Sequence, residues 1–389
     1  MPLQVNDFKV RGRPVRSGRA LAPDLPEQAR DNIQNAETQI SEPFKGITDG
    51  RLVPDLFALQ TTKLSNEEMK RSADALVDSL GPSQREETLF PVDSDAWRRW
   101  SNVHMFMMRH GTMLESLTPD QRNLSLALLR QSFSPSGFEL ARNIMKLNES
   151  IREITGSDEE LGEWLYWLSI LGEPSLDEPW GWQIDGHHLN FNCFLLGGQM
   201  VMTPMFMGSE PVAVDIGKYA GTRVFQAEES TGLNLARTLS VEQRRKAILS
   251  EDVPSGVFTA AFRDNFELRY EGVRFDDLTS QQQALMFELI GTYVHRMRSD
   301  QAQLKLDEIK QHLNKTYFAW MGGTEEESVF YYRVHSPVIL IEFDHQNGIF
   351  LDNDAASRNH IHTVVRTPNG NDYGKDLLRQ HRESNHSHG

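Results

Sequence analysis

Apolar positions with helical spacing occupy two long stretches of the chain. Residues 66–80 place apolar side chains three or four positions apart, which predicts one amphipathic helix. Residues 118–155 have the pattern of a helix pair, with Pro119 at the first helical position. Helical spacing returns over residues 240–316, where Thr279 marks the start of one helix. The pattern therefore predicts two separate groups of helices.

Each helical stretch leads into segments that alternate polar and apolar residues. Alternation over 181–194 and 199–206, with Gly197-Gly198 between them, predicts a hairpin. Strand patterns return over 331–335 and 338–344. We therefore expect an α+β protein in which helix pairs pack on an antiparallel sheet.

The two halves of the chain resemble each other. Leu117-Thr118-Pro119-Asp120-Gln121 is similar to Leu278-Thr279-Ser280-Gln281-Gln282, and Trp182-Gln183-Ile184 is similar to Tyr332-Arg333-Val334. In that alignment Asn192 corresponds to Glu342. Duplication would give a helix-helix-strand-strand module used twice, and chance similarity between amphipathic segments is the alternative. We expect an extended N-terminal arm over 1–40, α+β halves over 41–235 and 236–382, and a disordered tail over 383–389.

Composition excludes some functions. The net charge of −15 over 389 residues argues against a nucleic acid or an anionic membrane as the main partner. The start of the chain has no apolar signal core, and no stretch approaches the roughly 20 apolar residues of a membrane span. The single cysteine, Cys193, cannot form an internal disulfide, so we expect a cytoplasmic protein. Any metal site must then use histidine, carboxylate or water.

The segment Asn359–Arg366 carries the most informative pattern. In an extended strand His360, His362 and Arg366 share one face, and the two imidazoles lie about 7 Å apart along the strand at a rise of about 3.3 Å per residue. Such a pair can converge on one metal ion, and a second pair, His187-His188, lies far upstream. A surface or hydrogen-bonded histidine pair is the simpler alternative.

Carboxylates complete the candidate site. Glu342 and Asp344 lie on one face of an otherwise apolar strand, where a carboxylate needs a partner, water or a metal. If the strands share one sheet, we expect the metal ligands His188, Glu342, His360 and His362. This nitrogen–oxygen set suits a divalent transition metal such as iron, copper, manganese or zinc. Alternatively, the carboxylates pair with nearby arginines.

Four further residues are candidates for catalysis. Arg333 and Arg366 could each hold a substrate carboxylate through paired hydrogen bonds. His381 ends an apparent helix over 375–382 and could fold back onto the site, and either His381 or Asp344 would move protons. These roles imply a small substrate, with an anionic group where an arginine binds it.

An ordered series of motifs resembles the family of bacterial and fungal proteins with domain of unknown function 3500. The matching motifs run in order along the chain over roughly residues 60–382: Gly186-His187-His188-Leu189-Asn190, Thr203-Pro204-x-Phe206-x-Gly208, Glu210-Pro211, Phe318-Ala319-Trp320-x-Gly322, Tyr331-Tyr332-Arg333-Val334, Ile341-Glu342-Phe343-Asp344, Asn359-His360-Ile361-His362, Arg366 and Gly374-x-Asp376-Leu377-Leu378-x-x-His381. The resemblance implies that His381 belongs among the candidates. The insert Gln346–Arg358 is longer and more polar than the family pattern. The family name carries no activity.

Three functions are compatible with these residues. The first is a metal-dependent enzyme that acts on a small organic molecule by redox or oxygen chemistry, which two histidines and one carboxylate would support. The second is a hydrolase or lyase that uses a metal-bound water. The third is a non-catalytic protein with a structural metal or a ligand pocket.

Overall fold

The structure is a computed structural model that describes residues 9–11, 27–60, 62–102 and 109–386. Its helices are α1 Glu27–Ser41, α2 Glu67–Ser79, α3 Pro82–Thr88, α4 Pro119–Ser132, α5 Pro135–Thr155, α6 Gln226–Thr238, α7 Val241–Ala247, α8 Ser280–Val294, α9 Ser299–Lys310 and α10 Lys375–His386. Within these ranges, no helix is both long enough and apolar enough to cross a membrane.

The strands of the described residues form one 13-stranded sheet in the order β1-β3-β4-β5-β7-β13-β12-β11-β10-β8, with β2, β6 and β9 paired beside β3, β5 and β10. Their bounds are β1 Leu89–Phe90, β2 Thr112–Met113, β3 Tyr166–Leu171, β4 Trp180–Gly186, β5 Leu189–Leu196, β6 Gln199–Val201, β7 Met205–Ser209, β8 Ile248–Ser250, β9 Val273–Arg274, β10 Tyr317–Gly322, β11 Phe330–His335, β12 Leu340–Gln346 and β13 Ser357–Arg366. The α+β class is confirmed. The sheet is mixed, because β1 and β8 pair in parallel with β3 and β10.

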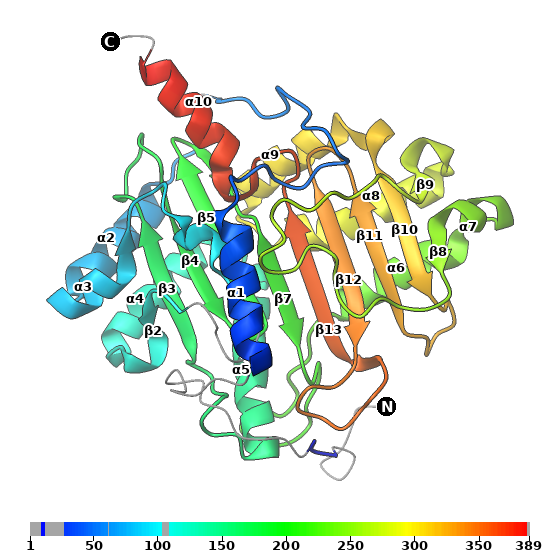
Figure 1. The fold of residues 1–389 in the computed structure, drawn as a ribbon, viewed down its shortest axis with the longest axis horizontal. Coiled ribbons are helices and arrows are strands. Elements are labelled where there is room, and N and C mark those ends of the chain that lie inside the picture. The colour runs from blue at the N-terminus through cyan, green and yellow to red at the C-terminus, as the bar shows by residue number, and fades with distance from the viewer. Residues whose placement is uncertain (1–8, 12–26, 61, 103–108, 387–389) are drawn as a thin grey trace.

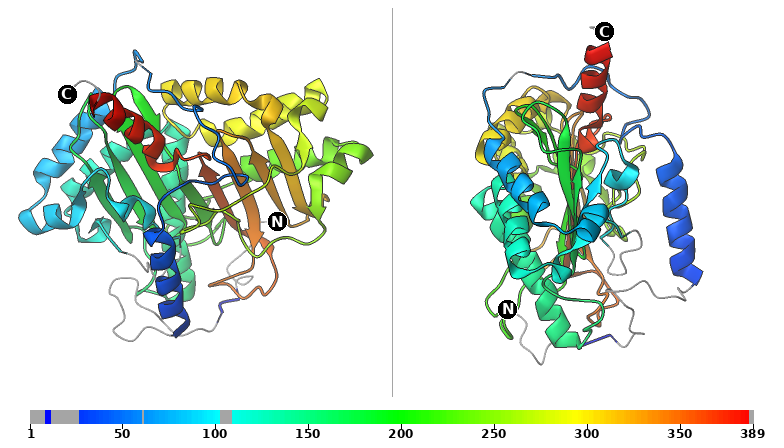
Figure 2. Two further views of the ribbon diagram at one scale, coloured as in Figure 1. Left: turned by 45° about the horizontal axis from the view of Figure 1, so that its top comes forward. Right: turned by 90° about the vertical axis from the view of Figure 1, so that its left-hand side faces the viewer.

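The helix pairs cover one face of this sheet, and α1 lies across the other (Figure 1; Figure 2, right). The helix-covered face is aromatic: Phe133 packs on Phe191 with ring centroids 4.6 Å apart. The opposite face is buried but polar. There the Gln183 amide donates to Asn192 Oδ1 over 2.6 Å, which offsets the cost of removing both amides from water.

The two halves repeat each other in detail. Thr118 and Gln121 form a capping box at α4, and Thr279 and Gln282 form the same box at α8. The sheet pairs Gln183 with Asn192 and Arg333 with Glu342, which is the correspondence that the two segments show in the sequence. The halves meet where β7 pairs with β13. One continuous sheet therefore contains both.

The chain ends are more ordered than expected. Residues 27–41 of the expected extended arm form α1, whose last carbonyls accept hydrogen bonds from Arg98. That arginine satisfies groups that a helix end otherwise leaves unpaired. The helix α10 runs to His386, into the expected disordered tail. Residues 1–8, 12–26 and 387–389 lie outside the described residues, and the domain boundaries stay a prediction.

Candidate metal centre

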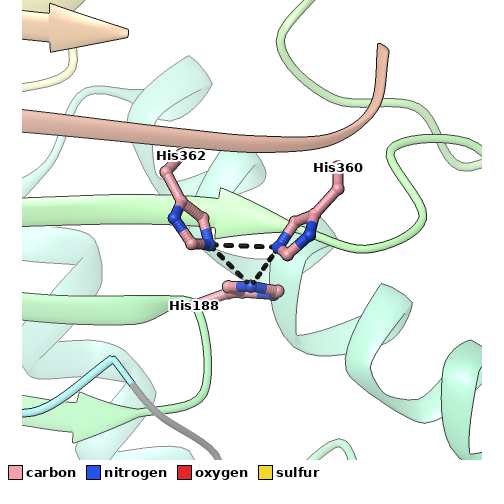
Figure 3. Close-up of side chains that lie close together, drawn as sticks. All are labelled: His188, His360 and His362. Carbon is pink, nitrogen blue, oxygen red and sulfur yellow. Dashed lines mark hydrogen bonds between the residues drawn. The ribbon is translucent and has the colours of Figure 1, made fainter. Parts of the chain in front are cut away.

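Three histidines from two distant parts of the chain converge on one point (Figure 3). His188 lies in the two-residue turn between β4 and β5, while His360 and His362 lie on one face of β13. The three Nε2 atoms form a triangle in which every edge measures 3.1 Å. Among the described residues, this trio is the group of His, Cys, Asp and Glu whose donor atoms lie close enough together to hold an ion.

Gly208 explains how the rings can meet. The strand β7 runs between β5 and β13, and its Gly208 pairs with His362. Because Gly208 has no side chain, the rings of His188 and His362 close over its backbone. A Cβ there would lie 2.8 Å from His362 Cδ2 and 3.0 Å from His188 Cδ2.

The turn that carries His188 is strained and firmly held. His188 has a φ of 64°, in the left-handed region that costs a non-glycine residue about 1 kcal/mol or more. The Gly208 N–H donates to the His188 carbonyl over 2.8 Å, and the Tyr166 hydroxyl donates to the His187 carbonyl over 3.1 Å. The His187 ring stacks on His188, and its Nδ1 lies 2.8 Å from Asn148 Oδ1. These contacts fix the ring of His188 in place.

The tautomer of His360 is also set by its surroundings. Its Nδ1–H donates to the Asn347 carbonyl over 2.7 Å, so its Nε2 turns a lone pair toward the other two rings. Glu210 accepts from the backbone N–H groups of residues 349–351 and lies 3.9 Å from His360 Nδ1. Glu210 therefore holds the loop that orients His360. Sequence reasoning gave Glu210 no role, although it follows β7 directly.

The electrostatics of the centre favour neutral imidazoles. Burial lowers the pKa of His360, and the charge of Glu210 opposes this only in part. Burial and the neighbouring His360 and His187 lower the pKa of His362 well below its ordinary value. Unprotonated rings are the form that binds metal.

Glu342, which we expected to be a ligand, does not join the triangle. Its carboxylate accepts from the backbone N–H groups of Phe258 and Thr259 over 2.8 and 2.9 Å and from the Tyr331 hydroxyl over 2.7 Å. The register explains the difference: Glu342 pairs with Val364, two positions along from His362. Glu342 anchors the loop that contains Phe258 instead.

The two arginines expected to bind substrate differ in how many of their donors are already used. Arg366 is fully buried, and its guanidinium donates to Asp264, Asp372 and the carbonyls of Thr259 and Ala260. Arg333 donates to Glu271 over 3.0 Å. The Arg366 guanidinium therefore has no donor left for a substrate in this structure, while the Arg333 Nε has no hydrogen-bond partner among the described residues. The substrate-binding role of Arg333 stays a prediction.

Asp344 and His381 lie in different places. Asp344 pairs with His362 across β12 and β13, so its side chain lies on the same face of the sheet as that ring. Its Oδ2 accepts from Gln346, while Oδ1 has no hydrogen-bond partner in the described part of the chain. Burial and the charge of Glu342 raise its pKa well above the ordinary value. His381 lies on α10, where its Nε2 is 3.2 Å from Glu178.

Comparison with known proteins gives a family but no activity. Residues 62–375 match the model of a family described as proteins of unknown function, DUF3500. The chain belongs to this family. No curated protein and no solved structure matches the chain. The DUF3500 match includes all three histidines of the triangle and ends before His381.

Proposed function

We propose that the protein is a zinc-dependent hydrolase in which His188, His360 and His362 hold the ion. The observation that carries the proposal is the triangle of Nε2 atoms with 3.1 Å edges. Zinc binds imidazole nitrogen at about 2.0–2.1 Å, and three histidines with an open fourth position are a known catalytic zinc set. For an ion at that distance from all three nitrogens, each N–metal–N angle would be about 98°, which lies between the octahedral and the tetrahedral angle.

The charge of the site suits water activation. Three neutral imidazoles leave the full charge of the ion in place, and such an ion lowers the pKa of its bound water to about 7. A metal-bound hydroxide would then be present at neutral pH. It would attack the carbonyl carbon of an ester or amide, forming a C–O bond while the bond to the leaving alcohol or amine breaks.

Asp344 is the candidate proton donor for this reaction. Burial raises its pKa, which favours the protonated form of the carboxyl, and it pairs with His362 across the sheet. The leaving group would take the Asp344 proton, and the next metal-bound water would return a proton to Asp344. The overall reaction consumes one water and yields an acid plus an alcohol or amine.

The hydrolytic function is preferred over redox chemistry because of the ligand set. Iron enzymes that activate oxygen commonly use two histidines and one carboxylate. The expected carboxylate, Glu342, instead accepts hydrogen bonds from Phe258, Thr259 and Tyr331. An all-histidine set fits zinc better.

Metal content and activity test the proposal together. Protein purified without chelator or histidine tag should contain about one zinc per chain, and zinc removal and return should abolish and restore hydrolysis of 4-nitrophenyl acetate. His360→Asn should lose both zinc and activity. His312→Asn, which changes a histidine on the helix-covered side, is the matched control and should lose neither. Stoichiometric iron or copper with oxygen consumption, or zinc retained by His360→Asn, would overturn the proposal.

A further inference from the structure

A cavity of about 440 Å³ lies on the polar side of the sheet and reaches the candidate metal centre. The helix α1 lines one side, the loop of residues 255–263 lines another, and His362 and Gln346 belong to its lining. Figure 2 shows α1 on this side of the sheet, on the opposite side from the helix pairs. The volume is typical of small-molecule sites. The cavity therefore gives a ligand a route to one face of the histidine triangle.

The lining mixes apolar residues with polar side chains that are almost all uncharged. Most of its polar side chains are carboxamides and hydroxyls: Asn32, Asn35 and Gln39 from α1, with Asn102, Gln346, Ser101 and Ser255. Among the described residues that line it, Arg263 carries the one charge, and its guanidinium donates to the Phe258 carbonyl over 3.2 Å. A carboxamide offers both a donor and an acceptor. Such walls match ligand groups that also donate and accept, such as hydroxyls and amides.

The cavity wall is built rigidly. Phe262 has a φ of 65°, an unusual conformation for a bulky residue, and packs against Ala36 and Ile40 of α1. Two positions on, buried Asp264 accepts from both Arg98 and Arg366. Backbone strain of this kind persists only where surrounding contacts enforce it, and it clusters at binding sites. A wall fixed in this way is preorganised for a ligand.

Arg98 ties the same cluster to the helix. Its guanidinium donates to the carbonyls of Gln39, Ile40 and Glu42 at the end of α1 and to Asp264 in the loop. The two walls of the cavity are therefore joined through one buried side chain. Their spacing is set without a ligand.

We propose that this cavity binds the substrate of the hydrolase, and that the substrate is an uncharged ester or amide with further hydroxyl or amide groups. This inference rests on the proposed function and adds a substrate class to it. It differs from the expected anionic substrate, because Arg366 has no free donor and Arg263, the one charged residue of the described lining, is outnumbered by carboxamides. Water adds to the carbonyl carbon, and the released alcohol or amine takes a proton.

Matched esters test the substrate class. With zinc-loaded protein, kcat/KM for the 4-nitrophenyl ester of N-acetylglycine should exceed that for 4-nitrophenyl hydrogen succinate at least tenfold. Ser255→Arg puts a cation into the lining and should reduce that ratio at least tenfold with zinc content unchanged. Ser230→Arg, on α6 behind the sheet, is the matched control and should keep the wild-type ratio. A wild-type preference for the anionic ester, or a ratio that Ser255→Arg leaves unchanged, would overturn the cavity proposal.

Binding separates the two proposals. Calorimetry with the stable amide N-acetylglycinamide and with succinamate should show tighter binding of the neutral compound, and Ser255→Arg should reverse the order. If this holds while no ester is hydrolysed, the hydrolase is wrong and the ligand class stands. If esters are hydrolysed with zinc but without preference for the neutral one, the hydrolase stands and the ligand class is wrong. If neither compound binds and no ester is hydrolysed, both are overturned.

Discussion

Gly208→Ala is expected to damage the metal centre while leaving the fold intact. The new Cβ would lie 2.7 Å from the Ile361 carbonyl oxygen, 2.8 Å from His362 Cδ2 and 3.0 Å from His188 Cδ2. Ordinary contacts between carbon atoms lie at about 3.5–4.0 Å, so each ring must retreat by roughly 0.5–1 Å. Metal–ligand distances tolerate only about 0.2 Å. The strain falls directly on two of the three proposed ligands.

The size of the effect follows from these distances. Overpacking of this kind costs about 1–3 kcal/mol of stability. Disturbance of the groups that orient metal ligands typically weakens binding 10–100-fold, and we expect zinc affinity to fall by that factor. Competition with a chromophoric chelator measures the affinity, and urea unfolding of the metal-free protein measures the stability.

A matched glycine provides the control. At Gly81 the nearest atom to an added Cβ is Gln84 Oε1 at 3.7 Å, and the φ of −70° suits any residue. Gly81→Ala should therefore leave zinc affinity unchanged. If Gly208→Ala also binds zinc as tightly as the wild type, the histidines are not confined as the structure implies, and the reasoning is refuted.

Three further predictions test the account. Glu342→Gln should keep its zinc but lose about 2–3 kcal/mol of the free energy of unfolding measured in urea, because the carboxylate accepts buried hydrogen bonds. Loss of zinc in this variant would show instead that Glu342 is a metal ligand. Burial raises the pKa of Asp185 to about 8, so the folded state binds more protons than the unfolded state between about pH 4 and 8. This group therefore makes stability fall as pH rises through that range, and Asp185→Asn should flatten the fall in urea titrations; an unchanged slope would contradict the assignment. Zinc at 100 times its Kd should stabilise the protein by about 2.7 kcal/mol, visible as a raised Tm in calorimetry, and His188→Asn should remove the effect; a Tm rise retained by that variant would place the zinc elsewhere.

Local patterns made much of the fold predictable. The same capping chemistry opens α4 at Thr118 and α8 at Thr279, and it is visible as the same residue types at the same spacing. Strand alternation placed His360 and His362 on one face without knowledge of their neighbours. Both rules act over a few residues, so one sequence is enough to apply them.

The register and the order of the strands in the sheet could not be predicted from local patterns. The register of β12 against β13 decides that Asp344, and not Glu342, lies beside His362, and a shift of two residues would put Glu342 there and Asp344 beside His360. The intervening strand β7 was part of the predicted hairpin, but its place beside β13 was not foreseen. Pairwise register depends on packing across the whole sheet.

Most of the hydrogen-bond partners of Arg366 lie far away in the sequence. Arg366 binds Asp264, which lies 102 positions away, and no local pattern connects them. The left-handed turn at His188 has no glycine to mark it. An isolated arginine or histidine in a sequence therefore carries no sign of whether its hydrogen bonds are already made.

Anomalous diffraction at the zinc edge from a crystal grown with zinc tests the central claim most directly. The account predicts one strong peak at about 2.0–2.1 Å from the Nε2 atoms of His188, His360 and His362, with the remaining coordination open to the cavity beside His362. A peak at Glu342 or His381, or no peak at the triangle in crystals that contain zinc elsewhere, would contradict it.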